Sequence, residues 1–232
     1  NNYQNSFVTI NGKWENQKKH CISFENPCLS ENELKNAQKS HQNKNYDKEL
    51  NICFVGHMEI NKGAEKLINA LKFDLSHLNF NKVYFIGDGS KRKFYFEKAK
   101  SISETNVKFL GEIDKNQLFK IYEKCHLIIL PSNSEGFPKV IAEAGAHGCV
   151  PVVSKVGSII HYINSSNGYL LNQNNANSIY NNLCLVNAAR ESLKSKAENI
   201  VELSNDFTFE KYIKNIHKLI LKINFKKNET IS

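Results

Sequence analysis

The feature that most constrains the fold is a series of short apolar segments along residues 51 to 171, separated by stretches with helical periodicity. Each segment has the length and composition of a buried strand. The five predicted strands are NICFVG (51–56), KVYFIG (82–87), VKFLG (107–111), LIIL (127–130) and VPVVS (150–154). The segment NGYLL (167–171) predicts a sixth, shorter strand.

The stretches between these strands carry apolar side chains at helical spacing. Leu67, Ile68 and Leu71 form one such stripe, with Lys and Glu on the opposite face. Residues 177 to 204 and 209 to 223 are also predicted to be mostly helical. Strands that alternate with helices of this length indicate βαβ units, and nearly continuous apolar strands indicate a parallel sheet covered on both faces. The predicted fold class is therefore α/β, with an open, doubly wound parallel sheet.

The periodic pattern also sets the predicted domain limits. Residues 1–48 lack a sustained period and are rich in Asn, Lys and Gln, so they do not form a domain by themselves. Residues 49–225 form the predicted domain, and residues 226–232 are expected to fray. The chain begins with Asn, Met58 is its single Met, and no signal-peptide pattern is present, so we expect a fragment of a longer protein.

The net charge of +8 and the pI of about 9.1 favour anionic partners. Nucleic acid, an acidic membrane surface or a phosphorylated small molecule fits this charge, and so does a solvated Lys-rich surface. No basic stretch is interleaved with aromatic residues like an RNA-recognition strand, and no zinc-finger spacing occurs, so we predict no nucleic-acid partner. The dense basic segment KRKFYFEKAK (91–100) predicts an amphipathic helix. No apolar run approaches the roughly 18 residues of a membrane span.

The six cysteines are scattered, lie mostly in apolar surroundings and form no CxxC pair. This distribution is typical of reduced thiols in a cytosolic protein. We therefore expect a cytoplasmic location and no metal site. The six are Cys21, Cys28, Cys53, Cys125, Cys149 and Cys184.

The segment PSNSEGFPKVIAEAGAHG (131–148) places two carboxylates beside the end of a predicted strand. In an open α/β sheet, ligands bind where the carboxyl ends of strands meet helix N-termini. Pro138 suits the first helical position, and Gly136 allows a ligand to approach the backbone closely. The free amides from Phe137 to Val140 are suited to a phosphate oxygen.

The two carboxylates belong to Glu135, in the loop, and Glu143, on the second turn of the predicted helix. We expect both to face one crevice, because the loop bends back over the start of the helix. Two alternatives remain open. Glu143 would be a solvent-facing residue paired with Lys139, or Glu135 would be an ordinary loop acid near a helix N-terminus, where negative charge is favoured.

The segment SEGFPKVIAEA (134–144) resembles the Glu-x7-Glu signature of retaining glycosyltransferases with the GT-B architecture, a group that includes sucrose and glycogen synthases. The resemblance covers residues 51 to 171. ICFVGHMEINKG (52–63) is similar to the group's first strand and loop, and VYFIGDGS (83–90) to its second strand and turn. VKFLGEIDKNQLFKIYEKCHLIILPS (107–132) and GCVPVVSKVGSIIHYI (148–163) are similar to the units that follow.

The resemblance implies that the chain is the C-terminal, donor-binding half of such an enzyme, with a Rossmann-like doubly wound sheet. Residues 1–48 would be the end of a missing N-terminal domain and the interdomain linker. Within them, residues 11 to 34 would carry the last strand of that domain. The acceptor-binding half would be absent.

The resemblance also implies roles for individual residues. Glu135 would contact hydroxyl groups of the donor sugar, Lys62 would bind the diphosphate, and Glu143 would hold the ribose hydroxyls. His57 stands where the family usually has Arg, and it would complete the catalytic set with Glu135 and Lys62. An alternative is that His57 is an ordinary loop histidine. The residues implied to bind the donor are Gly56, Glu112, Ile113, Gly136, Phe137, Pro138, Lys139, Val140 and Glu143, with Glu112 and Ile113 near the nucleobase.

Four further positions lie in or near these motifs. Ser158 replaces the family's second Gly in VGSIIHYI, and His161 stands where an acid is common, so the geometry around the donor sugar should differ here. His126 and His147 are interpreted as structural, because a His beside an apolar strand or at a helix end seldom binds a ligand.

The function implied by the resemblance is transfer of a sugar from a UDP- or GDP-linked donor to a saccharide or lipid-linked acceptor, with retention of configuration, in surface polysaccharide biosynthesis. No cofactor besides the donor substrate and no metal are expected. Peripheral contact with the inner face of the membrane is a further expectation. The alternative is a non-catalytic nucleotide-binding module, or a basic module that binds a membrane or nucleic acid.

Overall fold

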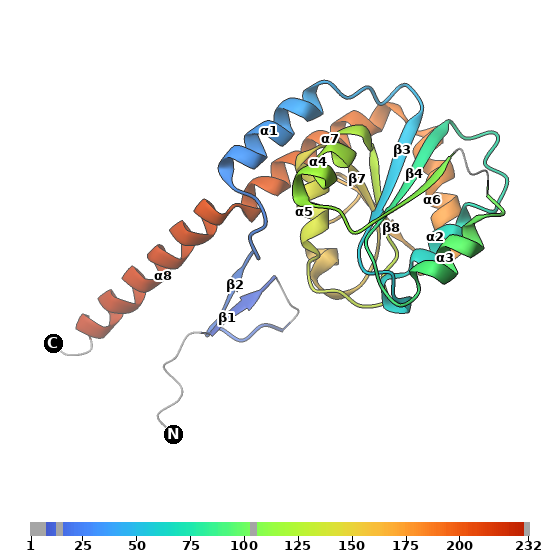
Figure 1. Ribbon diagram of the computed structural model, residues 1–232. Helices are drawn as coiled ribbons and strands as arrows, with labels where there is room; N and C mark the ends of the chain where they lie inside the picture. The colour runs from blue at the N-terminus through green and yellow to red at the C-terminus, as the bar shows by residue number, and fades with distance from the viewer. Residues whose placement is uncertain (1–7, 13–15, 103–105, 230–232) are drawn as a thin grey trace.

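A six-stranded sheet lies at the centre of the protein, between two layers of helices (Figure 1). The computed structural model describes residues 8–12, 16–102 and 106–229. The strands lie in the order β5-β4-β3-β6-β7-β8, and every neighbouring pair is parallel. The strands of this sheet are β3 (Leu50–Val55), β4 (Phe80–Ile86), β5 (Val107–Gly111), β6 (Leu127–Leu130), β7 (Val150–Ser154) and β8 (Tyr169–Leu171).

Helices cover both faces of the sheet, which is the doubly wound arrangement. On one face lie α2 (Ala64–Ala70), α3 (Arg92–Ala99) and α6 (Ala176–Ala188). On the other lie α1 (Glu31–Gln42), α4 (Lys115–Lys124), α5 (Lys139–Ala146) and α7 (Glu191–Ser204). The remaining elements are β1 (Val8–Asn11), β2 (Cys21–Phe24), α8 (Phe209–Glu229) and the short 3₁₀ helices η1 (Ile60–Lys62), η2 (Gly157–His161) and η3 (Asn205–Phe207).

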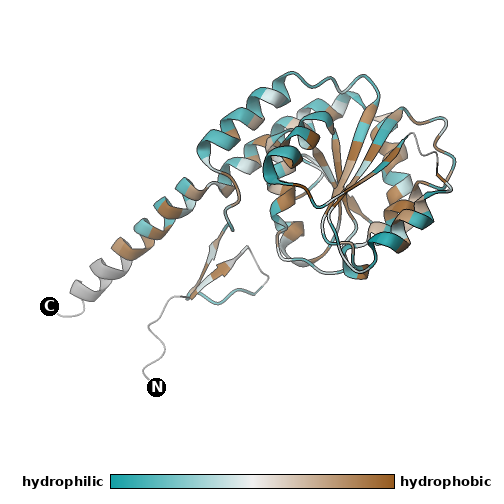
Figure 2. Cartoon of the chain, in the orientation of Figure 1, coloured by the Kyte–Doolittle hydropathy of each residue, from teal (hydrophilic) through white to brown (hydrophobic). Residues whose placement is uncertain are grey.

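The predicted fold class is confirmed, and each predicted strand occurs within two residues of its expected limits. The central strands are buried because their side chains are apolar on both faces, and the hydropathy colouring shows this band through the middle of the molecule (Figure 2). The predicted helical stretch from 177 to 204 is divided into α6 and α7, with the break after Ala188.

The first part of the chain divides into two pieces. Its strands β1 and β2 form a separate parallel pair, whereas α1 packs against α4 and α5 and buries Leu34 and Ala37. Tyr46, just after α1, is also part of the core. Residues 28 to 46 of the predicted linker therefore contribute to the same hydrophobic core as the sheet. The assignment of residues 1–48 to a missing domain and linker stays a prediction, and residues 1–7 and 13–15 lie outside the described part.

A parallel β-bridge joins the segment just before α1 to the segment just before α8. Leu29 forms a parallel bridge with Thr208, the N–H of Cys28 donates to Phe207 O at 2.9 Å, and the N–H of Phe209 donates to Leu29 O at 2.9 Å. Beyond this bridge, α8 extends away from the sheet (Figure 1). Its backbone is helical to Glu229, so it reaches into the stretch predicted to fray, of which residues 230–232 are not described.

Within the described residues, every helix is either too short or too polar to cross a lipid bilayer. All six cysteines are unpaired, and Cys28, Cys53, Cys125 and Cys149 are buried.

His126 and His147 are buried in the core, in agreement with their structural interpretation. Burial lowers the pKa of both to about 4. In His126, the Nδ1 atom accepts a hydrogen bond from the backbone N–H of Asn51 at 3.0 Å. Protonation of Nδ1 would remove this acceptor, so the fold requires the neutral ring.

We expect the free energy of unfolding to fall as the pH is lowered from about 6.5 to about 4. In this range the unfolded chain binds a proton at His126 and the folded chain does not, so the unfolded state is favoured. The substitution His126→Asn keeps an acceptor but does not titrate, and it should make this decline shallower. Denaturant unfolding measured at several pH values tests this. An unchanged slope in the variant would contradict it.

Candidate donor-binding site

The candidate site lies at the carboxyl edge of the sheet, between β3 and β6. These two strands are neighbours, but the chain passes from β3 to β4 on one side and from β6 to β7 on the other. The connections therefore diverge at this point and leave a crevice, which is where open α/β sheets bind their ligands.

The loops after β3 and β6 are joined through their backbones and through the Lys66 side chain on α2. The N–H of Asn133 donates to Asn61 O at 2.8 Å, and Lys66 Nζ donates to Pro131 O at 3.1 Å. Gly63 adopts a φ of 78°, and a Cβ there would lie 2.1 Å from the carbonyl oxygen of Pro131. Only glycine allows this approach, so the two loops form one rigid unit.

The loop after β4 joins the same unit. The N–H of Met58 donates to Asp88 O at 2.9 Å. Gly87 has a φ of 125°, and a Cβ there would lie 2.1 Å from Gly56 O. The loops that follow β4, β3 and β6 are therefore connected, and together they form the floor of the site.

A crevice of about 560 Å³ opens above this floor. Apolar side chains of Val55, Ile86, Leu118 and Leu130 form part of its lining. Nine of the twelve residues that the sequence predicted also line it: Gly56, His57, Lys62, Glu112, Ile113, Glu135, Pro138, Lys139 and Val140. The crevice thus brings together predicted residues from the loops after β3, β5 and β6 and from the start of α5.

Within the crevice, Lys62 and Glu135 form an ion pair, with Nζ 2.7 Å from Oε1. The Glu135 side chain is 11% exposed and that of Lys62 is 29% exposed, so water screens the pair less than it would a surface pair. Lys62 ends η1 and Glu135 precedes α5, so the pair spans the point where the connections diverge. A cation and a carboxylate are held there within reach of one ligand.

The start of α5 differs slightly from the prediction. Pro138 is the N-cap residue, with φ −72° and ψ 124°, and the helix begins at Lys139, so placing Pro138 at the first helical position was wrong by one residue. The physical reason is that its ψ is extended. The N–H groups of Lys139 and Val140 have no partner inside the helix, whereas that of Ile141 donates to Pro138 O at 3.0 Å. The first two face a site where an anion is favoured.

The loop before α5 is held from behind by an aromatic cluster. The Phe137 ring stacks on Phe207 at 4.7 Å and lies 4.5 Å from the Tyr162 ring, so it is not part of the crevice lining. Gly136 is exposed and also outside the lining, and a Cβ there would meet no atom within 4 Å. Gly157 has a φ of 55°, and a Cβ there would lie 1.6 Å from the backbone oxygen of Glu135.

Glu143 lies one turn along α5 from Lys139 and does not line the crevice. Burial raises the pKa of its carboxyl, while the positive charges of Lys115 and Lys139 oppose that shift. The side chain is only partly exposed, because the small residues of α5 let neighbouring elements pack around it, so the alternative of a fully solvent-facing Glu143 is wrong. Its predicted ribose contact stays a prediction.

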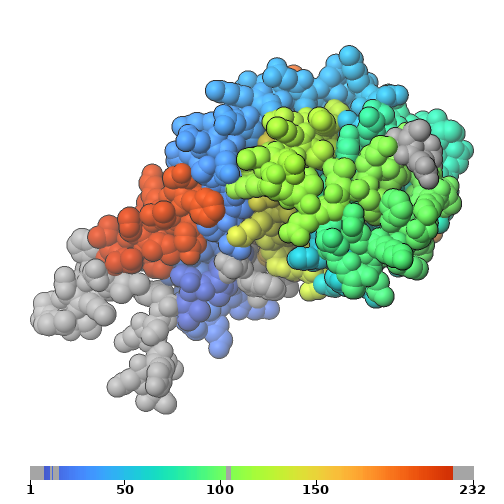
Figure 3. All heavy atoms as spheres, in the orientation of Figure 1, coloured from blue at the N-terminus to red at the C-terminus, as the bar shows by residue number. Residues whose placement is uncertain are grey.

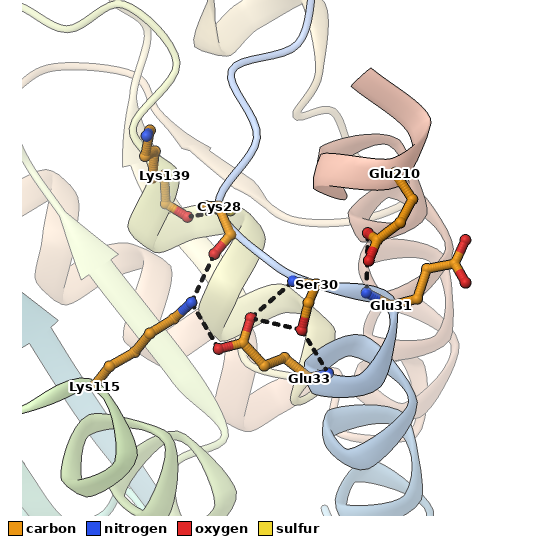
Figure 4. A network of polar contacts seen from close by, with 7 residues as sticks. All are labelled: Cys28, Ser30, Glu31, Glu33, Lys115, Lys139 and Glu210. Atoms are coloured by element: carbon orange, nitrogen blue, oxygen red, sulfur yellow. Dashed lines mark hydrogen bonds and ion pairs between the residues drawn. The ribbon is translucent and has the colours of Figure 1, made fainter. Parts of the chain in front are cut away.

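A polar network ties the crevice helices to residues 28 to 33 (Figure 4). Lys115 Nζ, at the start of α4, donates to Cys28 O at 3.0 Å and lies 2.8 Å from Glu33 Oε1. Glu33 and Ser30 form a capping box at the start of α1. The N–H of Glu31 donates to Glu210 on α8 at 3.1 Å. The spacing of Ser30 and Glu33 was visible in the sequence, whereas nothing there indicated Lys115.

Other residues near the site were not predicted as site residues. Asp88 lines the crevice, and its carboxylate lies 3.9 Å from Arg92. The Gly-Asp-Gly turn in the sequence could have indicated it. Ser158 is buried and His161 is exposed. Among the described residues, no three or more His, Cys, Asp or Glu side chains are grouped as metal ligands would be.

Residues 35–202 match the family described as glycosyl transferases group 1. An uncharacterized glycosyltransferase of Methanocaldococcus jannaschii is 29% identical over 167 residues, which are 72% of this chain and 46% of that relative. The chain thus spans about half the length of such a relative.

Two solved structures show the same fold. The C-terminal domain of a group 1 glycosyl transferase from Francisella tularensis has a TM-score of 0.62 at 21% identity, covering 79% of this chain and 96% of that one. Anabaena HepE, in complex with UDP and glucose, has a TM-score of 0.67 at 18% identity, covering 97% of this chain and 62% of that one.

The chain belongs to the group 1 glycosyltransferase family, because the family match covers more than half of its residues. Its sheet and helix layers have the Rossmann-like architecture of GT-B glycosyltransferases, as the resemblance in the sequence implied.

The glycines around the crevice allow a matched test. Gly157→Ala should destabilise the protein by about 1–3 kcal/mol, because its Cβ would overlap the Glu135 carbonyl. Gly136→Ala should leave the melting temperature unchanged, since its Cβ meets open space. Thermal unfolding of the two variants checks the contrast, and equal melting temperatures would contradict the loop geometry described above.

Proposed function

We propose that this chain is the donor-binding half of a retaining glycosyltransferase. The enzyme would transfer a hexose-type sugar from a UDP- or GDP-linked donor to a saccharide or lipid-linked acceptor. The observation that carries the proposal is the ion pair of Lys62 and Glu135, at 2.7 Å, beside the open N-terminus of α5.

This arrangement suits the two ends of a nucleoside diphosphate sugar. The Lys62 ammonium and the first amides of α5 offer positive charge and N–H donors to the diphosphate, and they would stabilise the charge that develops as it departs. The Glu135 carboxylate accepts hydrogen bonds from sugar hydroxyls. When the donor binds, Lys62 would share its charge between Glu135 and the diphosphate. Anabaena HepE, which has the same fold, forms a complex with UDP and glucose. This supports a nucleotide sugar as the ligand.

The remaining residues take the roles that the family resemblance implies. His57 is exposed at the crevice and would donate a hydrogen bond to the diphosphate where the family usually has Arg. Glu112 and Ile113 would border the nucleobase, and Glu143 would bind the ribose. We propose no cofactor and no metal besides the donor, because the ammonium and amide groups already supply positive charge.

The proposed setting is surface polysaccharide biosynthesis in the cytoplasm, with contact to the inner face of the membrane. The net charge of +8 supports a partner surface that carries negative charge. A lipid-linked acceptor would place the reaction at that surface.

A second candidate is nucleotide binding without transfer. It is favoured for this chain by its coverage of 46% of its relative from Methanocaldococcus jannaschii. Donor hydrolysis distinguishes the two: release of UDP or GDP from the matching nucleotide sugar by this chain supports catalysis, and tight binding without release supports the second candidate.

Lys62→Ala should lower kcat by about 10²–10³ in a full-length enzyme, because loss of one well-placed donor costs about 2.7–4 kcal/mol in the barrier. Lys72→Ala, an exposed lysine just after α2, is the matched control and should retain normal activity. A Lys62→Ala enzyme that keeps kcat within a few-fold of the unmodified enzyme would remove Lys62 from the mechanism.

Glu143→Gln should weaken nucleotide affinity about ten- to a hundredfold, because a charge-assisted hydrogen bond contributes roughly 1.5–3 kcal/mol. Burial raises the pKa of Glu143, so nucleotide affinity of the unmodified chain should fall as the pH decreases toward that pKa, and the variant should lose this dependence. Calorimetry with UDP and GDP measures both effects. The exposed Glu123→Gln serves as control, and equal affinities for all three proteins would exclude Glu143 from the site.

A further inference from the structure

Helix α3 and the edge strand β5 carry an unusual surface at the end of the molecule away from α8 (Figure 3). The helix predicted at 91–100 is present, but its expected amphipathic character was wrong. Phe94 is 53% exposed and Phe96 is 47% exposed, whereas Tyr95 and Ala99 form its buried side. The two phenylalanines therefore face solvent on either side of the buried Tyr95, about 160° apart around the helix axis.

The same surface is strongly basic. Residues 91 to 111 contain six Lys and Arg and two Glu, which gives a net charge of +4 (6 − 2). Lys93 and Lys100 on α3 and Lys108 on β5 are exposed. Half of the chain's net charge of +8 corresponds to this stretch of 21 residues.

Lysines lie over the exposed rings. Lys98 Nζ is 5.7 Å from the centre of the Phe94 ring, and Lys100 Nζ is 5.6 Å from that of Phe96. A hollow of about 270 Å³ beside Phe96 is lined by Phe96, Ala99, Lys100, Val107, Lys108 and Phe109. Both ammonium groups also form ion pairs, Lys98 with Glu65 at 2.5 Å and Lys100 with Glu97 at 2.8 Å, so a phosphate would have to share them with these carboxylates.

The core holds Phe96 in place. Its ring packs edge-on against Phe109 at 5.6 Å, and Phe109 stacks on Phe85 at 4.7 Å. This contact fixes the side chain in its exposed position. The exposed ring therefore needs little further ordering when it binds, which lowers the entropic cost of burying it.

We propose that α3 and β5 form a docking surface for a membrane that contains anionic lipids. Phe94 and Phe96, on the two sides of α3, would reach the boundary between headgroups and acyl chains, and the exposed Lys93, Lys100 and Lys108 would extend to the lipid phosphates. A lipid surface fits better than nucleic acid, because base stacking needs a free ring face and an ammonium covers one face of each ring.

The position of this surface suits a lipid-linked acceptor. Arg92, at the start of α3, lies 3.9 Å from Asp88, which lines the donor crevice. Docking through α3 would therefore hold the crevice close to the membrane. The proposal deepens the membrane contact in the proposed function, but its test does not depend on activity.

The test is co-sedimentation of the 232-residue chain with vesicles of phosphatidylcholine alone and with vesicles of equal parts phosphatidylcholine and phosphatidylglycerol. We expect binding to the anionic vesicles only, weakening as salt is added. The double variant Phe94→Ser, Phe96→Ser and the double variant Lys93→Glu, Lys100→Glu should each lower the partition constant more than about tenfold.

Matched controls lie on other surfaces. The control for the phenylalanines is Leu185→Ser on α6, where Leu185 is 57% exposed, and it should bind like the unmodified chain. The control for the lysines is the double variant Lys120→Glu, Lys124→Glu on α4, which should lose only the binding that follows from its lower net charge. The phenylalanine variant should stay folded, with a melting temperature lowered only by the lost contact between Phe96 and Phe109, and its UDP affinity should stay unchanged. This would show that the fold and the donor site are intact.

Several outcomes would overturn the proposal. The first is that the chain does not bind anionic vesicles, and the second is that the phenylalanine variant binds them as well as the unmodified chain does. The third is that substitution of Ile213 and Ile220 on α8, and not of the phenylalanines, abolishes binding. Tighter binding of double-stranded DNA than of anionic vesicles through this surface would assign it to nucleic acid. A dimer in sedimentation that the phenylalanine variant disrupts would assign it to a second copy. Absence of UDP binding would count against the proposed function and leave the vesicle result valid.

Discussion

The backbone contact between the loops that follow β3 and β6 is the constraint on which the site depends. Gly63 lies against the Pro131 carbonyl, and the N–H of Asn133 bonds to Asn61. These contacts fix the distance between two segments that are far apart in the sequence, since they join Gly63 to Pro131 and Asn61 to Asn133. Because both loops are fixed, the ammonium of Lys62 and the carboxylate of Glu135 meet without help from a ligand. The charges are therefore organised before binding, and little reorganisation is needed when an anion arrives.

The surroundings of the crevice divide into an anchored side and an open side. The aromatic cluster of Phe137, Tyr162 and Phe207 and the network around Lys115 hold the starts of α5 and α4 from behind. On the open side, Gly136 and His57 face solvent. This division suits a ligand that enters from the open side and binds to groups that the anchored side holds in place.

Much of the fold and part of the site could be predicted from the sequence, because buried parallel strands and helix stripes leave strong local patterns. The strands β3 to β8 and the loop and helix start at residues 135 to 140 followed from such patterns, whereas Lys62, His57, Glu112 and Ile113 were indicated by the family resemblance. The contributions of α1 and Tyr46 to the core could not, since their burial depends on long-range packing against α4 and α5. Lys115 was missed for the same reason. The position of Glu143 outside the crevice lining depends on how closely the neighbours of α5 approach, which spacing along one helix does not reveal.

The bridge between Leu29 and Thr208 has a mechanical consequence. The segment that enters the sheet-containing body at Leu29 and the segment that leaves it at Thr208 lie side by side and are joined by this parallel bridge. The segments that carry β2 and α8 thus leave the body beside this bridge, and each also contacts it elsewhere, Glu25 at Tyr162 and Glu210 at Glu31. A rotation at the bridge would therefore move both segments together. Phe207 is adjacent to this bridge and also stacks on Phe137. Such a rotation would therefore displace Phe137 and the loop that carries Glu135.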